Sequence, residues 1–185
     1  RVAVGRGVLA LGGRDVEDAR GLLVEALTAT GRHPEIQVRL GELLLREGRF
    51  EDALPLFIEA LEAMHYQGSQ LAWAAHVGAA KAYLGQRALE AAEGELARLA
   101  EINRNHSAYR YLQGVLELKK GNREEARELL LDTISERPFA QRELLVLAGI
   151  EAEDGNLEKA REFVRRHLAQ APYSLPGIRL QALIH

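Results

Sequence analysis

The sequence predicts an all-α solenoid, in which helical hairpins stack on one another in chain order. Similar short segments recur along the sequence, such as "GNREEAREL" and "GNLEKAREF", and each has an alanine at the same position. That alanine series is Ala19, Ala53, Ala92, Ala126 and Ala160. A second series of small residues is Gly7, Gly41, Ala80, Gly114 and Ala148. Both series step by 34, 39, 34 and 34 positions, so the chain is built from a 34-residue unit with one five-residue insertion.

Each unit contains two stretches with apolar residues at helical spacing. In the unit at 34–67 they are Ile36, Leu40, Leu43 and Leu44, followed by Leu54, Phe57, Ile58 and Leu61. This three-and-four spacing places the apolar side chains on one face of each helix. The unit is therefore predicted to be a helical hairpin that buries its apolar face against the next hairpin.

Glycines and asparagines mark the turn within each hairpin. Gly48, Gly121 and Gly155 stand where the first helix must end, and glycine adopts a left-handed C-cap conformation without steric cost. Asn122 and Asn156 follow directly and are predicted to cap the second helix through their side chains, Asn122 within a capping box. Each hairpin should thus have a tight turn between two well-defined helices.

The small residues of the two series are expected where the two helices of a hairpin approach most closely. Proline marks the ends of later units, at Pro138 and Pro172. The insertion contains Ser69, a good N-cap for a lengthened helix that runs through Trp73. Pro176 fits the first turn of a last helix.

The repeat resembles the tetratricopeptide repeat, with its small residues and aromatic or aliphatic positions at fixed spacing. Leu40-Gly41-x2-Leu44 followed by Ala53-x3-Phe57 is the best match. Glu117 and Glu151 depart from the pattern, since the family usually has an aromatic residue there. The resemblance implies a right-handed superhelix whose first helices line the concave surface and whose second helices form the back.

The resemblance covers almost the whole chain, so a single solenoid is expected over 1–185. Its predicted parts are a partial repeat at 1–33, repeats at 34–67, 73–106, 107–140 and 141–174, and the first helix of a truncated repeat at 175–185. Both ends stop within the array without a polar capping helix. We therefore expect a longer natural protein and end-to-end self-association of this piece.

The opening Gly5-x-Gly7-x-x-Ala10 also fits the phosphate-binding turn of a dinucleotide domain. That fingerprint needs a strand before it and an acidic strand end about twenty residues later. The nearest acidic candidate, Glu25, lies in a predicted helix, and Gly7 is the first member of the small-residue series. The repeat explains this stretch and the nucleotide site does not.

Composition excludes several kinds of chemistry. The chain has no cysteine, which removes disulfides, thiolate metal sites and cysteine nucleophiles. Its net charge of −3 disfavours nucleic acid as a partner, and no apolar run is long enough to insert into a membrane. The six histidines have no metal-ligand spacing, and His76 and His167 are expected to be partly buried and hydrogen-bonded. We predict no catalytic residue, no metal and no cofactor, and hence no enzyme.

The positions that the resemblance places on the concave surface form a mixed apolar and charged set. Tyr111 is the most prominent, because an aromatic side chain offers a large contact area at low entropic cost. It is equally well explained by packing against the next helix. The predicted partner-binding set is Val38, Glu42, Leu45, Val77, Lys81, Leu84, Tyr111, Val115, Lys119, Arg142 and Leu145.

The leading functional hypothesis is a non-catalytic interaction scaffold that holds another protein or a peptide segment on its concave face. The alternative is a regulatory repeat region of a larger enzyme whose active site lies outside this chain. The sequence and composition of 106–172 also resemble the repeat arrays of bacterial exopolysaccharide-export proteins. That resemblance implies a role in organising a synthesis and export complex, with the periplasm slightly favoured over the cytoplasm.

Overall fold

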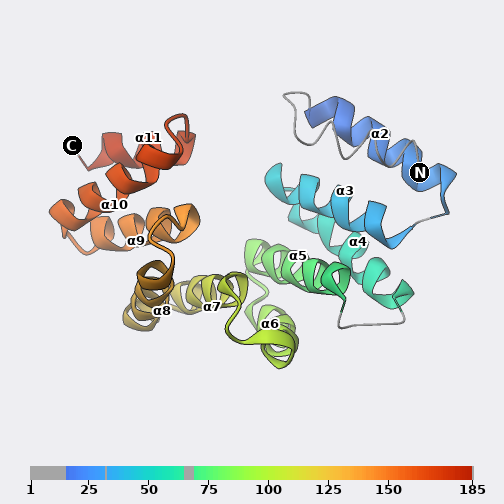
Figure 1. The fold of residues 1–185 in the computed structure, drawn as a ribbon, viewed down its shortest axis with the longest axis horizontal. Coiled ribbons are helices and arrows are strands. Elements are labelled where there is room, and N and C mark those ends of the chain that lie inside the picture. Colours follow the sequence, from blue (N-terminus) through green and yellow to red (C-terminus); the bar gives the residue numbers. More distant parts are fainter. Residues whose placement is uncertain (1–15, 32, 65–68, 185) are drawn as a thin grey trace. The chain divides into compact units, whose positions relative to one another are not determined.

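The computed structural model describes residues 16–31, 33–64 and 69–184, and all of their regular structure is helical (Figure 1). Within these residues the helices are α2 (Val16–Ala29), α3 (Pro34–Arg46), α4 (Phe50–Ala63), α5 (Gln70–Gln86), α6 (Leu89–Asn103), α7 (Ser107–Lys120), α8 (Arg123–Glu136), α9 (Gln141–Glu153), α10 (Leu157–Gln170) and α11 (Leu175–Leu183). The predicted all-α fold is confirmed over this part of the chain. The opening glycine motif at 5–10 lies outside it.

The chain divides into two compact units, an N-terminal unit (Arg1–Arg104) and a C-terminal unit (Asn105–His185). In each unit, consecutive helices pack against one another in chain order. α3 also packs on α5, and α9 packs on α11, so first helices of successive hairpins touch directly. This nearest-neighbour packing is the arrangement predicted for stacked hairpins.

The core of the N-terminal unit is centred on Phe57 of α4. Its ring is fully buried, and it lies so close to two glycines that a Cβ added to Gly41 or Gly78 would meet it at 2.7 or 2.3 Å. The small residue at position 41 is thus required by the helix approach, as the sequence predicted. Gly78, which belongs to neither repeat series, is needed for the same reason.

Three predicted glycine turns have the expected conformation. Gly48, Gly121 and Gly155 have φ angles of 74°, 94° and 81° and follow the ends of α3, α7 and α9. After α5 the same register position holds Arg87, with a φ of 61°, where a side chain is disfavoured. The turn geometry is therefore retained even where the repeat lacks glycine.

The prediction that Asn122 and Asn156 cap the second helices with their side chains is wrong. Both residues occupy the N-cap position, but neither side chain makes the capping hydrogen bond. Instead, Asn122 donates to Glu117 at 2.7 Å and Asn156 donates to Glu151 at 2.8 Å. Each carboxylate is buried, and a hydrogen bond to a buried charge stabilises more than one to a partly solvated helix end.

The other predicted helix ends agree with the structure. Ser69 accepts a hydrogen bond from the Ala72 backbone amide at 3.0 Å and starts α5, which at 17 residues is longer than α3 or α7. α8 and α10 end before Pro138 and Pro172. α11 begins with Pro176 in its first turn.

Candidate functional site

In the N-terminal unit, the predicted partner-binding residues lie on α3 and α5, two first helices that pack directly. Three of them, Val38, Val77 and Leu84, are buried. The other three, Glu42, Leu45 and Lys81, are partly exposed. This helix pair is closely packed, so its apolar members contribute to the core more than to an accessible surface.

In the C-terminal unit, the predicted residues retain more exposed surface. Tyr111, Val115, Lys119 and Leu145 are partly exposed, and Arg142 is exposed. α7 and α9, the first helices that carry them, are packed together less closely than α3 and α5. The looser approach leaves room for a pocket between their N-terminal ends.

This pocket, which we call the α7–α9 pocket, has a volume of about 320 Å³. Tyr111 and Arg142 both line it, one from each first helix. Four further lining residues matter for binding. They are Ser107 and Glu143, together with Arg137 and Phe139 from the turn between α8 and α9. The structure thus brings together two residues of the predicted set and adds an aromatic and a basic side chain.

The lining of the α7–α9 pocket combines aromatic and positively charged groups. Phe139 is 71% exposed, an unusual state for a large apolar side chain. Arg142 has no hydrogen bond or ion pair with the described part of the chain, whereas Arg137 donates to the Ser107 hydroxyl. Burial raises the pKa of Tyr111 and nearby Arg142 lowers it in part, so the phenol stays protonated and can donate.

Sequence reasoning missed Ser107, Arg137, Phe139 and Glu143 because it considered only the helix positions of the family pattern. One signal was present. Phe139 follows Pro138 in a turn between repeats, where polar residues are expected. An aromatic residue in such a turn favours a contact surface over a structural role.

The two histidines predicted to be buried and hydrogen-bonded are so. His167 of α10 uses both ring nitrogens, at 2.8 Å from the Gln141 carbonyl oxygen and 2.8 Å from the Ser174 hydroxyl. This histidine therefore ties α10 to the starts of α9 and α11. His76 of α5 contacts Glu95 of α6 through Nδ1 at 2.6 Å.

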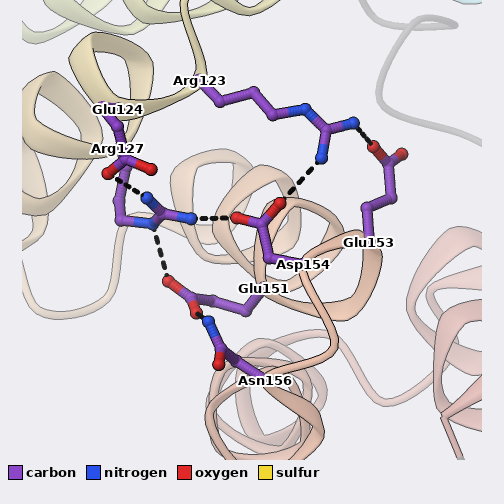
Figure 2. Close-up of polar contacts among 7 residues, drawn as sticks. All are labelled: Arg123, Glu124, Arg127, Glu151, Glu153, Asp154 and Asn156. Atoms are coloured by element: carbon purple, nitrogen blue, oxygen red, sulfur yellow. Dashed lines mark hydrogen bonds and ion pairs between the residues drawn. The ribbon is translucent and has the colours of Figure 1, made fainter.

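A network of arginines and carboxylates joins α8 to the end of α9 (Figure 2). Arg127 contacts Glu124, Asp154 and, at 2.9 Å, the buried Glu151. Arg123 binds Asp154 at 2.8 Å and also contacts Glu153. The pKa of Arg127 is raised, first by its hydrogen bond to Glu124 and against the effect of its own burial.

Every charged group in this network has a partner within it, which explains its role. The two arginines contact four carboxylates from α8 and the end of α9, and Asn156 donates a further hydrogen bond to Glu151. Such a set holds two hairpins together. We interpret it as structural.

Nothing in the described residues suggests a metal site or a membrane span. These residues contain no group of three or more histidine, aspartate or glutamate side chains placed to hold an ion. None of their helices has the length and apolar character needed to cross a bilayer.

Two family models match the sequence, both described as tetratricopeptide repeat. One covers residues 4–64 and 111–174, and the other covers 44–116. Together they span nearly all of the predicted repeats. No curated protein matches this sequence.

Several solved structures have the same fold. A thermophilic tetratricopeptide repeat protein of Thermus thermophilus, TTC0263, is similar with a TM-score of 0.77 at 20% identity, over 98% of this chain and 95% of that one. A chain of the Cut9–Hcn1 hetero-tetramer of the APC/C has a TM-score of 0.80 at 13% identity, over 98% of this chain and 35% of its own length. YrrB, described as having an unusual peptide-binding site, has a TM-score of 0.58 at 17% identity, over 97% and 90%.

At these identities the structural likeness establishes the fold alone. The family models add the sequence evidence, because the first of them by itself matches more than half of the chain. Proteins with this repeat are generally non-catalytic scaffolds for protein–protein interaction. By sequence and by fold, this chain belongs to the tetratricopeptide repeat family.

Proposed function

We propose that the chain is an interaction scaffold that binds a peptide segment of a partner protein in the α7–α9 pocket. The observation that carries the proposal is the meeting of Tyr111, Phe139 and Arg142 around one opening. Aromatic side chains and arginine dominate the binding energy of many protein interfaces. Tyr111 and Arg142 come from two first helices, the helices that the resemblance assigns to the concave surface.

The charges of the pocket indicate what kind of peptide fits. Arg142 is exposed and without a hydrogen-bond partner in the described structure, and Arg137 lies nearby in the turn. Only 7% of Glu143 is exposed, so its charge is less available to a ligand. We therefore propose a peptide with an apolar or aromatic residue next to a carboxylate, bound in a charge-assisted way by Arg142.

Peptide selection tests this proposal even though the partner is unidentified. A displayed random-peptide library is panned against the immobilised chain, and one enriched peptide is titrated against variants. Arg142→Glu and Tyr111→Ala are each expected to weaken binding at least tenfold. Arg179→Glu, a change at an exposed position of α11 outside the pocket, serves as the matched charge control and should bind like the native chain.

Unchanged affinity in both pocket variants would overturn the proposal. Circular dichroism melts of each variant check that the helices remain folded. The partly exposed predicted residues Val115, Lys119 and Leu145 extend the same surface along α7 and α9. In the N-terminal unit, Glu42, Leu45 and Lys81 are the partly exposed predicted residues of α3 and α5. Their alanine variants should have smaller effects than the two pocket variants.

A narrower proposal places this scaffold in a bacterial exopolysaccharide synthesis and export complex. It is supported by the resemblance of 106–172, in sequence and composition, to the repeat arrays of such proteins. The genes around the parent gene give the direct test, since polysaccharide synthesis and export genes should lie nearby. A neighbourhood without them, in several genomes that carry this chain, would contradict the narrower proposal and leave the peptide-binding proposal standing.

A further inference from the structure

A second, larger groove lies in the N-terminal unit between α4, α5 and α6. Its volume is about 820 Å³, within the range of sites that accept a ligand of substantial size. Its two walls are α4 and α6, the second helices of successive hairpins, and α5 contributes to its lining. We call it the α4–α6 groove.

Each wall presents one continuous helix face. On α4 the face is formed by Ile58, Leu61 and Glu62, at three- and four-residue spacing. On α6 it begins with Ala91 and Gly94, two of the smallest side chains. A Cβ added to Gly94 would meet no atom within 4 Å, so open space lies next to this backbone.

A polar triad of buried Glu95, buried His76 and exposed Arg98 lines the groove. Glu95 of α6 is 4% exposed, and its two oxygens accept from different partners, Arg98 at 2.6 Å and His76 Nδ1 at 2.6 Å. Because an ionised carboxylate can only accept, Nδ1 of His76 carries the proton of this bond.

The second ring nitrogen of His76 is available to a ligand. The residue is 5% exposed and lines the groove, and its Nε2 has no hydrogen-bond partner in the described part of the chain. In the neutral ring that carries its proton on Nδ1, Nε2 is a hydrogen-bond acceptor. Nε2 is not one of the fully buried atoms that lack a partner in the described residues, so it is accessible from the groove, where a donor of a ligand can reach it.

The charged side chains that line the groove determine whether a positively or a negatively charged donor is favoured. Glu62 and Glu101 are exposed on its two walls, and neither forms an ion pair with the described residues. Together with Glu95 they place three carboxylates in the lining against the single guanidinium of Arg98. The groove is therefore electronegative, and it favours a cationic donor.

We infer that the α4–α6 groove binds a basic amphipathic helix of a partner protein. A lysine ammonium or arginine guanidinium of that helix donates to His76 Nε2, and its aliphatic stem packs on Ile58 and Ile102. Further basic residues of the helix lie against Glu62 and Glu101. This surface belongs to second helices and is distinct from the α7–α9 pocket, so neither proposal depends on the other.

A pair of synthetic peptides provides the test. The probe is an end-blocked helix of about 15 residues, four turns long, with leucine and lysine at three- and four-residue spacing, and its counterpart has glutamate for lysine. Each is titrated into the isotopically labelled chain while backbone amide NMR shifts are followed. We expect saturable shifts on α4, α5 and α6 with the lysine peptide and at least tenfold weaker binding of the glutamate peptide.

A groove-filling substitution separates this site from general attraction to a basic peptide. Gly94→Leu places a side chain in the open space of the groove and should weaken binding at least tenfold. Gly21→Leu on α2 is the matched control, since this helical glycine also has nothing within 4 Å of an added Cβ. It should bind like the native chain, and both variants should melt no lower than the native chain.

Charge reversal provides the second arm. Glu62→Lys with Glu101→Lys should weaken binding of the lysine peptide at least tenfold, whereas Glu128→Lys at an exposed position of α8 should have no effect. Unchanged affinity in the groove variants, equal binding of both peptides, or shifts confined to other helices would each overturn the inference. Concentration-dependent shifts of the groove without peptide would identify a second copy of the chain as its occupant and overturn it as well.

Discussion

The two units use the same repeat position in opposite ways. At the position where the family usually has an aromatic residue, the N-terminal unit has Leu44 and Tyr83, and the C-terminal unit has Glu117 and Glu151. All four side chains lie near the end of a first helix, and both glutamates are buried. The same fold therefore accepts an apolar or an ionised side chain at this point.

The residue five positions later explains how the charge is tolerated. After Glu117 and Glu151 it is Asn122 and Asn156, which donate to the carboxylates, whereas after Leu44 and Tyr83 it is arginine or alanine. Removing a buried carboxylate from water is costly unless hydrogen bonds replace the lost hydration. The comparison indicates that glutamate and asparagine form one paired unit within the turn.

The units also differ in how closely their helices approach. In the N-terminal unit Gly78 touches the Phe57 ring, whereas the space beside Gly149 of α9 contains no atom within 4 Å of an added Cβ. Packing thus requires glycine at position 78. At position 149 glycine only lowers the helix propensity of α9.

The largest expected effect is the opposite response of these two glycines to alanine. Gly78→Ala should destabilise the N-terminal unit by about 2–3 kcal/mol, because overpacking against Phe57 exceeds the gain of about 1 kcal/mol in helix propensity. Gly149→Ala should stabilise the C-terminal unit by up to about 1 kcal/mol. Urea unfolding followed by helix-resolved hydrogen exchange measures both, and equal effects would contradict the packing difference.

A double-mutant cycle sharpens the comparison of the paired turn. Asn122→Ala alone should cost about 2 kcal/mol, since the buried Glu117 carboxylate loses its closest donor. Glu117→Tyr with Asn122→Ala reproduces the Tyr83–Ala88 combination of the N-terminal unit. In the Glu117→Tyr background, Asn122→Ala should therefore cost less than about 0.5 kcal/mol. Additive single effects in denaturant melts would show that the two residues do not act as a pair.

The two arginines of the network in Figure 2 differ in side-chain exposure, 15% for Arg127 and 41% for Arg123, and this difference provides the next test. Arg127→Met should destabilise by about 1–2 kcal/mol, because Glu151 at 3% side-chain exposure then keeps only Asn156. Arg123→Met removes pairs whose partners are more exposed and should cost less than about 1 kcal/mol. Thermal melts at low and high salt distinguish them, since salt should screen only the second; equal salt dependence would be inconsistent with this assignment.

The smallest expected effect concerns the turn that lacks glycine. Arg87→Gly should stabilise the N-terminal unit by up to about 1 kcal/mol, because glycine adopts the left-handed φ of 61° without strain. Gly121→Ala at the same register position of the C-terminal unit should have the opposite sign. A loss of melting temperature in Arg87→Gly would mean that the arginine side chain, and not the backbone, stabilises this turn.

Regular repetition made most of the fold predictable. The paired helices, the left-handed glycines and the lengthened α5 all follow from local rules and from the two series of small residues. The role of Asn122 could not be predicted in this way. A carboxylate five residues earlier competes for its amide only after the hairpin has formed, and capping rules do not consider such a partner.

The candidate sites were less predictable, for a related reason. Tyr111 and Arg142 were selected from the family register, but their shared pocket depends on how far α7 and α9 are separated. The α4–α6 groove depends on Ala91 and Gly94, whose importance lies in the side-chain volume that they leave empty. A sequence pattern identifies the residues that form the core. It does not identify the cavities that remain between helices, because these depend on how the helices pack.

A crystal structure of the chain with a selected acidic or aromatic peptide tests the central functional claim most directly. We predict that the peptide lies between the N-terminal ends of α7 and α9, with its carboxylate at Arg142 and an apolar side chain against Tyr111 and Phe139. A peptide seated elsewhere, with the α7–α9 pocket left empty, would contradict it.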